Sequence, residues 1–191
     1  TKVFVKDCDV TYVSNAEFVA ECEKDRDKIM VKAILLDEND NVVTYNTIEI
    51  EVFKREEEIF ETKNEIIFNL EPGEYEIAGE NVKVKACGML PVHFVSRKTG
   101  HKAVERFSDR DFSYWYDKET DMIKPILYNT FEADGFRPIL ISGNMDENGE
   151  WKETLACAEK DYNGKKYIIC NVDVRVENPI AARFLNELKK L

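Results

Sequence analysis

The sequence has no apolar run that approaches the roughly 18–20 residues of a membrane-spanning helix. It also has no secretory-type apolar segment and no basic amphipathic segment near its start. We therefore expect no membrane partner. The first residue is Thr1 rather than methionine, and we expect the chain to be a processed or excised part of a longer protein.

Positive charge is scarce in this sequence. Its 191 residues include 27 Lys+Arg and 38 Asp+Glu, which give a formal net charge of −11. Proteins that bind nucleic acid neutralise phosphates with lysine and arginine, so we expect no nucleic-acid partner. The acidity is uneven, because residues 1–87 hold 11 Lys+Arg and 21 Asp+Glu, whereas residues 88–191 hold 16 and 17. This asymmetry predicts two units, each long enough to bury a core.

Metal-ligand and disulfide patterns are also missing. The five cysteines are an odd number without CxxC spacing, and the only histidines are His93 and His101. We expect no disulfide framework, no metal and no cofactor. Free buried thiols are usual in a reducing compartment, which slightly favours the cytoplasm although the sequence does not assign a location.

The first half is predicted to consist of strands and turns. Residues 28–36 are apolar and β-branched, residues 37–41 form a turn cluster, and residues 42–53 alternate with a period of two, so a hairpin is expected. Further strands are expected at residues 15–22, 65–70, 74–77 and 82–86. About seven short strands with frequent turns are typical of an immunoglobulin-like β-sandwich. We therefore expect an all-β sandwich over residues 1–87.

The second half, residues 88–191, combines strand and helix patterns. Asn163 and Gly164 form a hairpin signal. The chain ends in an amphipathic helix with Asn178 as its N-cap, Pro179 as its first residue and apolar residues at a spacing of 3.6. These patterns predict a small α/β domain with a mixed sheet after the sandwich.

Cys87 is the strongest candidate for a nucleophile. It follows an expected strand and precedes Gly88, which suits a tight turn. A cysteine nucleophile needs a histidine base and an orienting carboxylate, and His101 with Glu105 completes the triad Cys87–His101–Glu105. The alternative is a half-buried cysteine at a domain junction with two surface histidines. Ala86 favours this alternative, because the nucleophile turn has a glycine on that side.

Aromatic residues gather at Tyr114, Trp115 and Tyr116, and a second tryptophan stands at Trp151. Aromatic rings bind the apolar faces of sugars, so these four residues are candidates for carbohydrate binding. Adjacent residues cannot all point the same way. The alternative is therefore a plug in the core or between domains.

Several motifs that would assign another chemistry are absent, namely GxGxxG, GxxxxGK[ST], GxSxG and HExxH. Nucleotide-binding, P-loop, serine-hydrolase and zinc-protease activities therefore have no support. The acidic runs at residues 37–41 and 146–149 lack the full spacing of a calcium loop, and we interpret them as hairpin turns.

Residues 92–191 resemble a known family. Residues 107–116 contain Asp-Phe-x-x-Trp-Tyr, and residues 177–188 contain Asn-Pro-x-Ala-x-Arg-hydrophobic-Leu. Shorter matching pieces lie at residues 92–95, 100–101, 137–140 and 162–170. This half of the chain is similar to the C-terminal glutamine-amidotransferase-like region of bacterial glycoside hydrolases of the family 2 β-galactosidase and β-mannosidase type. Residues 1–87 resemble the accessory β-domains of these enzymes only in general style.

The resemblance implies a non-catalytic accessory region that buttresses the catalytic domain, shapes its cleft or supports an oligomer. Its implied partners are the rest of a parent glycosidase and carbohydrate. The amidotransferase-like domain is expected to be truncated and degenerate, because the Gly-x-Cys-x-Gly motif is incomplete around Cys87 and Ala103 replaces the acid of His-x-Glu. Two alternatives stay open: a carbohydrate-binding module that uses the exposed aromatics, and a cysteine-dependent amidohydrolase.

Overall fold

The computed structural model describes residues 24–54, 56–57, 59–87, 95–96, 99–117, 119–125 and 127–191. The protein is mostly β, with 51% strand and 12% helix, so the β character continues through the second half. Contacts divide the chain into two compact units, Thr1–Glu56 and Glu57–Leu191. The strand expected at residues 15–22, the turn residue Gly88 and the strand residues 92–94 lie outside the described residues.

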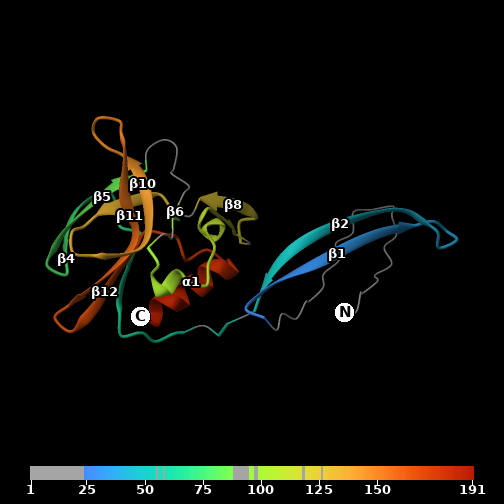
Figure 1. Ribbon diagram of the computed structural model, residues 1–191, viewed down its shortest axis with the longest axis horizontal. Coiled ribbons are helices and arrows are strands. Elements are labelled where there is room, and N and C mark those ends of the chain that lie inside the picture. Colours follow the sequence, from blue (N-terminus) through green and yellow to red (C-terminus); the bar gives the residue numbers. More distant parts are fainter. Residues whose placement is uncertain are drawn as a thin grey trace. The chain divides into compact units, whose positions relative to one another are not determined.

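The first unit contains an antiparallel ribbon of β1 (Arg26–Leu36) and β2 (Val42–Phe53), which confirms the predicted hairpin (Figure 1). Asp37 organises the turn, since its carboxylate accepts the backbone N–H groups of Asn39 and Asn41 at 2.9 and 2.8 Å. The side chain and backbone of Asn41, followed by the backbone of Asn39, hold the pKa of Asp37 below its ordinary value. This turn therefore fixes the register of the ribbon.

One face of the ribbon is charged. Lys28 pairs with Glu49 and Arg26 pairs with Glu51, each at 2.6 Å. These side chains share a face because residues two apart in a strand point the same way. The pairs lie in solvent, so each adds little stability but keeps this face polar.

The opposite face is apolar. The register places Ile29 against Ile50 and Val31 against Ile48, so all four side chains share one face. We call these four residues the apolar ribbon face. Ile48 is 58% exposed and Ile50 is 37% exposed. The described residues therefore leave much of this face open to solvent.

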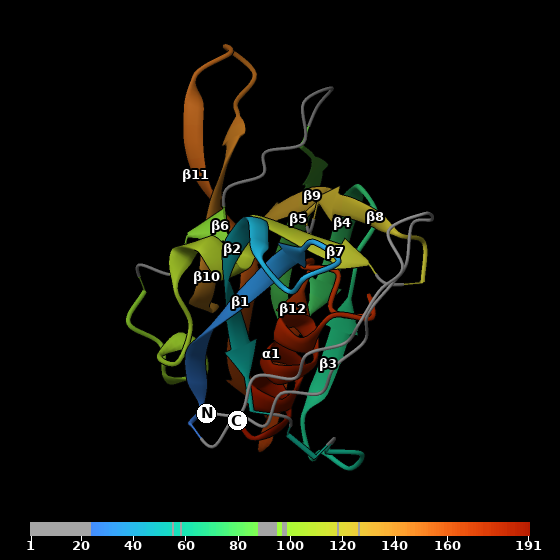
Figure 2. The ribbon, with the colours of Figure 1, turned by 90° about the vertical axis from the view of Figure 1, so that its right-hand side faces the viewer.

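The second unit is built on a curled eight-stranded sheet (Figures 1 and 2). The strand order along its main path is β3-β12-β11-β9-β5-β4, and β10 pairs with both β11 and β6. Every pairing is antiparallel except that of β12 with β3. The strands are β3 (Glu65–Phe68), β4 (Gly73–Ile77), β5 (Glu80–Ala86), β6 (Val95–Ser96), β9 (Asn129–Glu132), β10 (Arg137–Met145), β11 (Trp151–Tyr162) and β12 (Lys165–Cys170).

Strand β11 connects most of this sheet, because it pairs with β10 along residues 151–159, with β12 along residues 157–162 and with β9 at Leu155. Register shifts in β10 between Pro138 and Ile141 bend the strand and increase its twist. Residues 143–153, the outer parts of β10 and β11 with their turn, project beyond β9, and we call them the hairpin arm (Figure 2).

Smaller elements surround the sheet. The short 3-10 helices η1 (Lys102–Val104) and η2 (Asp109–Phe112) precede a pair formed by β7 (Tyr114–Asp117) and β8 (Met122–Pro125). The chain ends in α1 (Pro179–Lys189). The Asn178 side chain accepts the Ile180 N–H at 2.9 Å, which confirms the predicted N-cap.

The second unit has two hydrophobic clusters. In one, Phe184 of α1 packs edge to face on Phe107 and Phe112, with ring centroids 5.9 and 5.1 Å apart. The other includes Phe131 and Ile169. Ile168 belongs to the first cluster and Ile169 to the second, so β12 carries apolar residues on both faces.

The division between the units differs from the boundary expected at residue 87. Strands β3 and β5 were expected in the sandwich, but Ile66 of β3 pairs with Ile168 of β12, and Val84 of β5 pairs with Phe131 of β9. The physical reason is that β3 and β5 carry apolar residues that complete the two clusters of Glu57–Leu191. Of the strands expected at residues 1–87, only β1 and β2 are described within the first unit.

Candidate functional site

His101 uses one ring nitrogen in a hydrogen bond, while the other lies close to a carboxylate without forming a hydrogen bond. Nδ1 accepts the backbone N–H of Ala103 at 3.2 Å, which places the proton of the neutral ring on Nε2. Nε2 lies 3.3 Å from Oε1 of Glu159. A general base needs a free lone pair. His101 therefore has no nitrogen available to take a proton from Cys87.

Glu159 on β11 is a buried carboxylate, 2% exposed, and is the centre of a cluster of charged side chains. Its Oε1 is bound by Arg137, and its Oε2 lies 3.0 Å from the Lys166 ammonium. With His101, these residues form what we call the Glu159 cluster. One buried carboxylate thus faces two permanent cations and one imidazole, so the site is rich in positive charge.

This arrangement keeps the imidazole neutral. Burial, followed by the positive charges of Arg137, Lys102 and Lys166, lowers the pKa of His101 to about 4. A protonated His101 would be a third cation beside the Glu159 carboxylate, which Arg137 and Lys166 already share. It would gain little attraction there and would lose its hydration. His101 is therefore a neutral hydrogen-bonding residue near pH 7.

Cys87 lies near the Asn144 end of β10, whereas the Glu159 cluster lies near the Arg137 end. The Cys87 N–H donates to the Tyr128 carbonyl at 2.9 Å, and the preceding Ala86 carbonyl accepts from Asn144 at 3.1 Å. Asn144 is seven residues along β10 from Arg137, a span of about 23 Å in a strand. The structure does not bring Cys87 and His101 together. Glu105 follows η1 as an exposed residue, so the predicted triad is not assembled.

The predicted aromatic cluster is mostly a core feature. Trp115 is 1% exposed, and its indole N–H donates to the Asp111 carbonyl at 2.6 Å. Tyr116 is exposed and bonds through its hydroxyl to Asp121, which raises the pKa of Tyr116. The side chain of Tyr114 lies outside the described residues. Trp115 is therefore a core residue, as the plug alternative predicts, and its ring is not exposed for stacking on a sugar.

Trp151 has the geometry of an exposed platform. It begins β11, stands opposite Met145 of β10, and is 66% exposed. A Cβ placed on Gly143 would lie 3.3 Å from the Trp151 ring atom Cε3. The missing side chain at Gly143 therefore lets the indole pack against the strand. The ring covers Gly143 while most of its surface faces solvent.

Polar groups border this platform. Glu153 is exposed and shares the strand face of Trp151, since it lies two residues further along β11. At the tip of the arm, the Asp146 carboxylate accepts the N–H groups of Asn148 and Glu150 at 2.8 and 2.9 Å. An exposed indole beside carboxylate acceptors can stack on a sugar ring and accept bonds from its hydroxyl groups.

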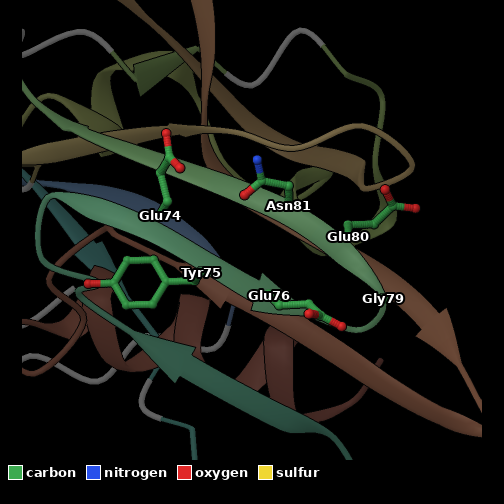
Figure 3. Close-up of a pocket in the computed structure, with 6 residues that line it drawn as sticks. All are labelled: Glu74, Tyr75, Glu76, Gly79, Glu80 and Asn81. Atoms are coloured by element: carbon green, nitrogen blue, oxygen red, sulfur yellow. The ribbon is translucent and has the colours of Figure 1, made fainter.

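An open concavity of about 410 Å³ lies on the β4–β5 hairpin (Figure 3). It is lined by Glu74, Tyr75, Glu76, Gly79, Glu80 and Asn81. Glu80 is paired with Lys160 of β11. The lining is strongly acidic, and it does not pair a nucleophile with a general base. The concavity is therefore a weaker candidate for a functional site than the hairpin arm.

Sequence reasoning did not find the Glu159 cluster. The sequence carries one local sign of the cluster: Glu159 directly follows Ala156, Cys157 and Ala158. The structure buries all three of these residues completely. A carboxylate that extends a buried strand must be paired. Its partners come from η1, β10 and β12, and strand periodicity does not identify them.

Comparisons with known proteins find no matching family model, no matching curated protein and no matching solved structure. Among the described residues, no group of three His, Cys, Asp or Glu side chains is placed to hold a metal ion. Within the same residues, no helix is long and apolar enough to cross a membrane.

Proposed function

We propose that the chain is a non-catalytic accessory region of a larger carbohydrate-active protein, of the family 2 glycoside hydrolase type. The motif resemblance at residues 107–116 and 177–188 suggests this class of parent. The structural observation that carries the proposal is the apolar ribbon face, which offers a surface for another part of that protein.

A two-stranded ribbon is marginally stable in water unless a further layer covers its apolar face. Ile48 and Ile50 are exposed at the middle of β2, opposite the ion pairs of Lys28 and Arg26. Full burial of an isoleucine side chain contributes roughly 1.5–3 kcal/mol. A sheet laid on this face would therefore gain several kcal/mol, while the charged face stays in water.

This proposal includes the finer fold assignment. The ribbon contributes two strands to an immunoglobulin-like sandwich, whose second sheet covers the apolar ribbon face. The part of the chain that ends in α1 is proposed to be a truncated, degenerate amidotransferase-like domain. The rest of the parent glycosidase is the proposed partner, and contacts between copies in an oligomer are compatible with the same role.

A dye-binding experiment tests the docking face. The 191-residue chain should enhance the fluorescence of an apolar-surface dye such as anilinonaphthalene sulfonate, and Ile48→Thr should reduce that signal. Met30→Thr is the matched control, because Met30 is also an exposed apolar residue but lies on the charged face. Equal reductions in both variants, or none in Ile48→Thr, would contradict the docking role.

The non-catalytic part of the proposal has its own test. The purified chain should release no nitrophenol from nitrophenyl β-galactoside or β-mannoside above the buffer rate. Iodoacetamide should label Cys87 slowly near neutral pH, because its side chain is buried and the Nδ1 lone pair of His101 already accepts the Ala103 N–H. Hydrolysis at a real rate, or rapid labelling of Cys87, would overturn it.

A second candidate function is carbohydrate binding by the hairpin arm, which the exposure of Trp151 over Gly143 specifically favours. The open indole would stack on a sugar ring, and Glu153 would accept hydrogen bonds from its hydroxyl groups. We expect weak binding, with a Kd of about 1 mM, because one stacked ring buries little area.

Calorimetry against a panel of gluco-, manno- and galacto-oligosaccharides measures this binding. Trp151→Ala should abolish the heat, and Gly143→Val should reduce it by pushing the ring off the strand. Tyr116→Ala is the matched control, since it removes an exposed aromatic side chain outside the arm. Equal heats for the parent chain and Trp151→Ala would exclude the platform.

A further inference from the structure

Cys157 and Cys170 form a pair across two strands. Cys157 lies on β11 and Cys170 lies directly opposite it on β12. Both are free thiols and both are wholly buried. They belong to the same hydrophobic cluster, so their side chains lie on the same face of the sheet.

The hydrogen-bond pattern shows how close the two backbones come. The Asn171 N–H donates to the Ala156 carbonyl at 2.9 Å, so Ala156 and Asn171 are a hydrogen-bonded pair. Antiparallel strands alternate between hydrogen-bonded and non-hydrogen-bonded pairs. Cys157 and Cys170 are therefore a non-hydrogen-bonded pair, in which the Cα atoms are about 4.5 Å apart and the side chains approach most closely. This separation lies at the short end of the roughly 4.4–6.8 Å that a disulfide spans.

We propose that Cys157 and Cys170 are a dithiol–disulfide couple, a modification site at which oxidation by a small disulfide such as oxidised glutathione links β11 to β12. The thiolate of one cysteine attacks a glutathione sulfur, which forms a mixed disulfide and releases one glutathione thiolate. The second cysteine thiolate attacks the protein-side sulfur and releases the other. The protein loses two protons and two electrons, and one glutathione disulfide becomes two thiols.

The surroundings make this reaction slow in the closed fold. Burial and the neighbouring Cys170 thiol raise the pKa of Cys157 well above its ordinary value. Thiolate is the reacting form. Oxidation therefore requires the β11–β12 hairpin, which turns at Asn163 and Gly164, to open far enough to admit the oxidant. Once the cross-link has formed, the same burial protects it from reductants.

The link would also change stability. It closes a loop of 14 residues, from Cys157 to Cys170, in the unfolded chain. A loop of this length raises the folding equilibrium constant by about a hundredfold when the native geometry accepts the bond without strain. The short Cα separation predicts a smaller gain together with easier reduction, because strained disulfides are the more reducible ones.

Glutathione oxidation of the full chain tests the proposal. The protein is incubated with oxidised glutathione at pH 8 in urea near its unfolding midpoint, so that both thiols become accessible, and is then returned to buffer. Trypsin digestion without reductant should yield a disulfide-linked pair of peptides, residues 153–160 and residues 167–175, because cleavage sites follow Lys152, Lys160, Lys166 and Arg175. Dithiothreitol should separate the two peptides, and the intact oxidised protein should lose the mass of two hydrogen atoms.

Variants identify the bond. Cys157→Ala and Cys170→Ala should each leave a single glutathione adduct on the remaining partner, whereas Cys87→Ser should leave the linked peptides unchanged. Urea exposes the thiols in every variant, so a variant that does not fold still reports its chemistry. Glutathione adducts without the cross-link in the parent chain, or a dominant bond that involves another cysteine, would overturn the proposal.

Discussion

Neutral His101 makes the stability of the second unit depend on pH. Its pKa is about 4 in the folded chain, whereas an unfolded histidine titrates near 6.5. Between these values the unfolded chain binds a proton that the folded chain does not, so stability decreases as the pH decreases from about 6.5 to about 4. The difference of about 2.5 pH units corresponds to about 3 kcal/mol lost by pH 4.

The neighbouring groups determine the sign of this effect. Glu159 alone would favour a charged imidazole, but Arg137 and Lys166 already neutralise that carboxylate, and Lys102 adds another positive charge. Asp37 and Asp146, whose pKa values are lowered by hydrogen bonds, lose their contributions only as the pH falls through and below their ordinary value of 3.8. The interval between pH 4 and 6.5 therefore reports mainly on histidine.

Urea unfolding between pH 4 and 7.5, followed by the fluorescence of buried Trp115, measures the effect. His101→Asn should be less stable than the parent at pH 7 but should lose little further stability on acidification, since asparagine keeps an acceptor for the Ala103 N–H. His93→Asn is the control for the second histidine and should keep the parental slope. Parallel curves for the parent and His101→Asn would refute the reasoning, as would a parent that becomes more stable below pH 6.5, which would indicate a charged His101 paired with Glu159.

Three further substitutions test the packing around the same unit by urea or thermal unfolding. Phe184→Ala should cost roughly 3–5 kcal/mol because it removes a wholly buried ring that packs on Phe112, and Leu185→Ala, at a partly buried position, should cost less. Asn178→Ala should cost about 1 kcal/mol through loss of the helix cap, and a serine there should restore most of it. Glu159→Gln should cost about 2 kcal/mol because it leaves the largely buried Lys166 ammonium beside an uncharged amide, with the exposed Asp161 as its remaining carboxylate, and an unchanged midpoint would show that this ammonium reaches solvent.

Local patterns in the sequence predicted the elements that depend on neighbouring residues. Alternation in residues 42–53 predicted β2, and Asn178 with Pro179 predicted the start of α1. The pairing of β3 with β12 was not predictable in this way. A period of two indicates which side chains share a face, but it does not identify a partner strand about 100 residues away.

The two tryptophans show the same limit at the candidate site. Trp115 and Trp151 are the same residue type, yet one is buried and bonds to the Asp111 carbonyl of η2 while the other covers Gly143. What separates them is the register of β10 and β11, which places a glycine diagonally across from Trp151. The Glu159 cluster was missed for the same reason, since its members come from η1, β10, β11 and β12.

The connection between the two ends of the second unit affects how the chain folds during synthesis. Asn186 of α1 accepts the Ile59 N–H at 3.1 Å, and Asn64 donates to the Leu188 carbonyl at 3.0 Å. Strand β3 likewise pairs only with β12 among the described strands. Residues 57–68 therefore leave the ribosome more than a hundred residues before their partners in α1 exist. The apolar side chains of β3 stay in solvent or on a chaperone until β12 and α1 have been synthesised, and folding of this unit is expected to be slow.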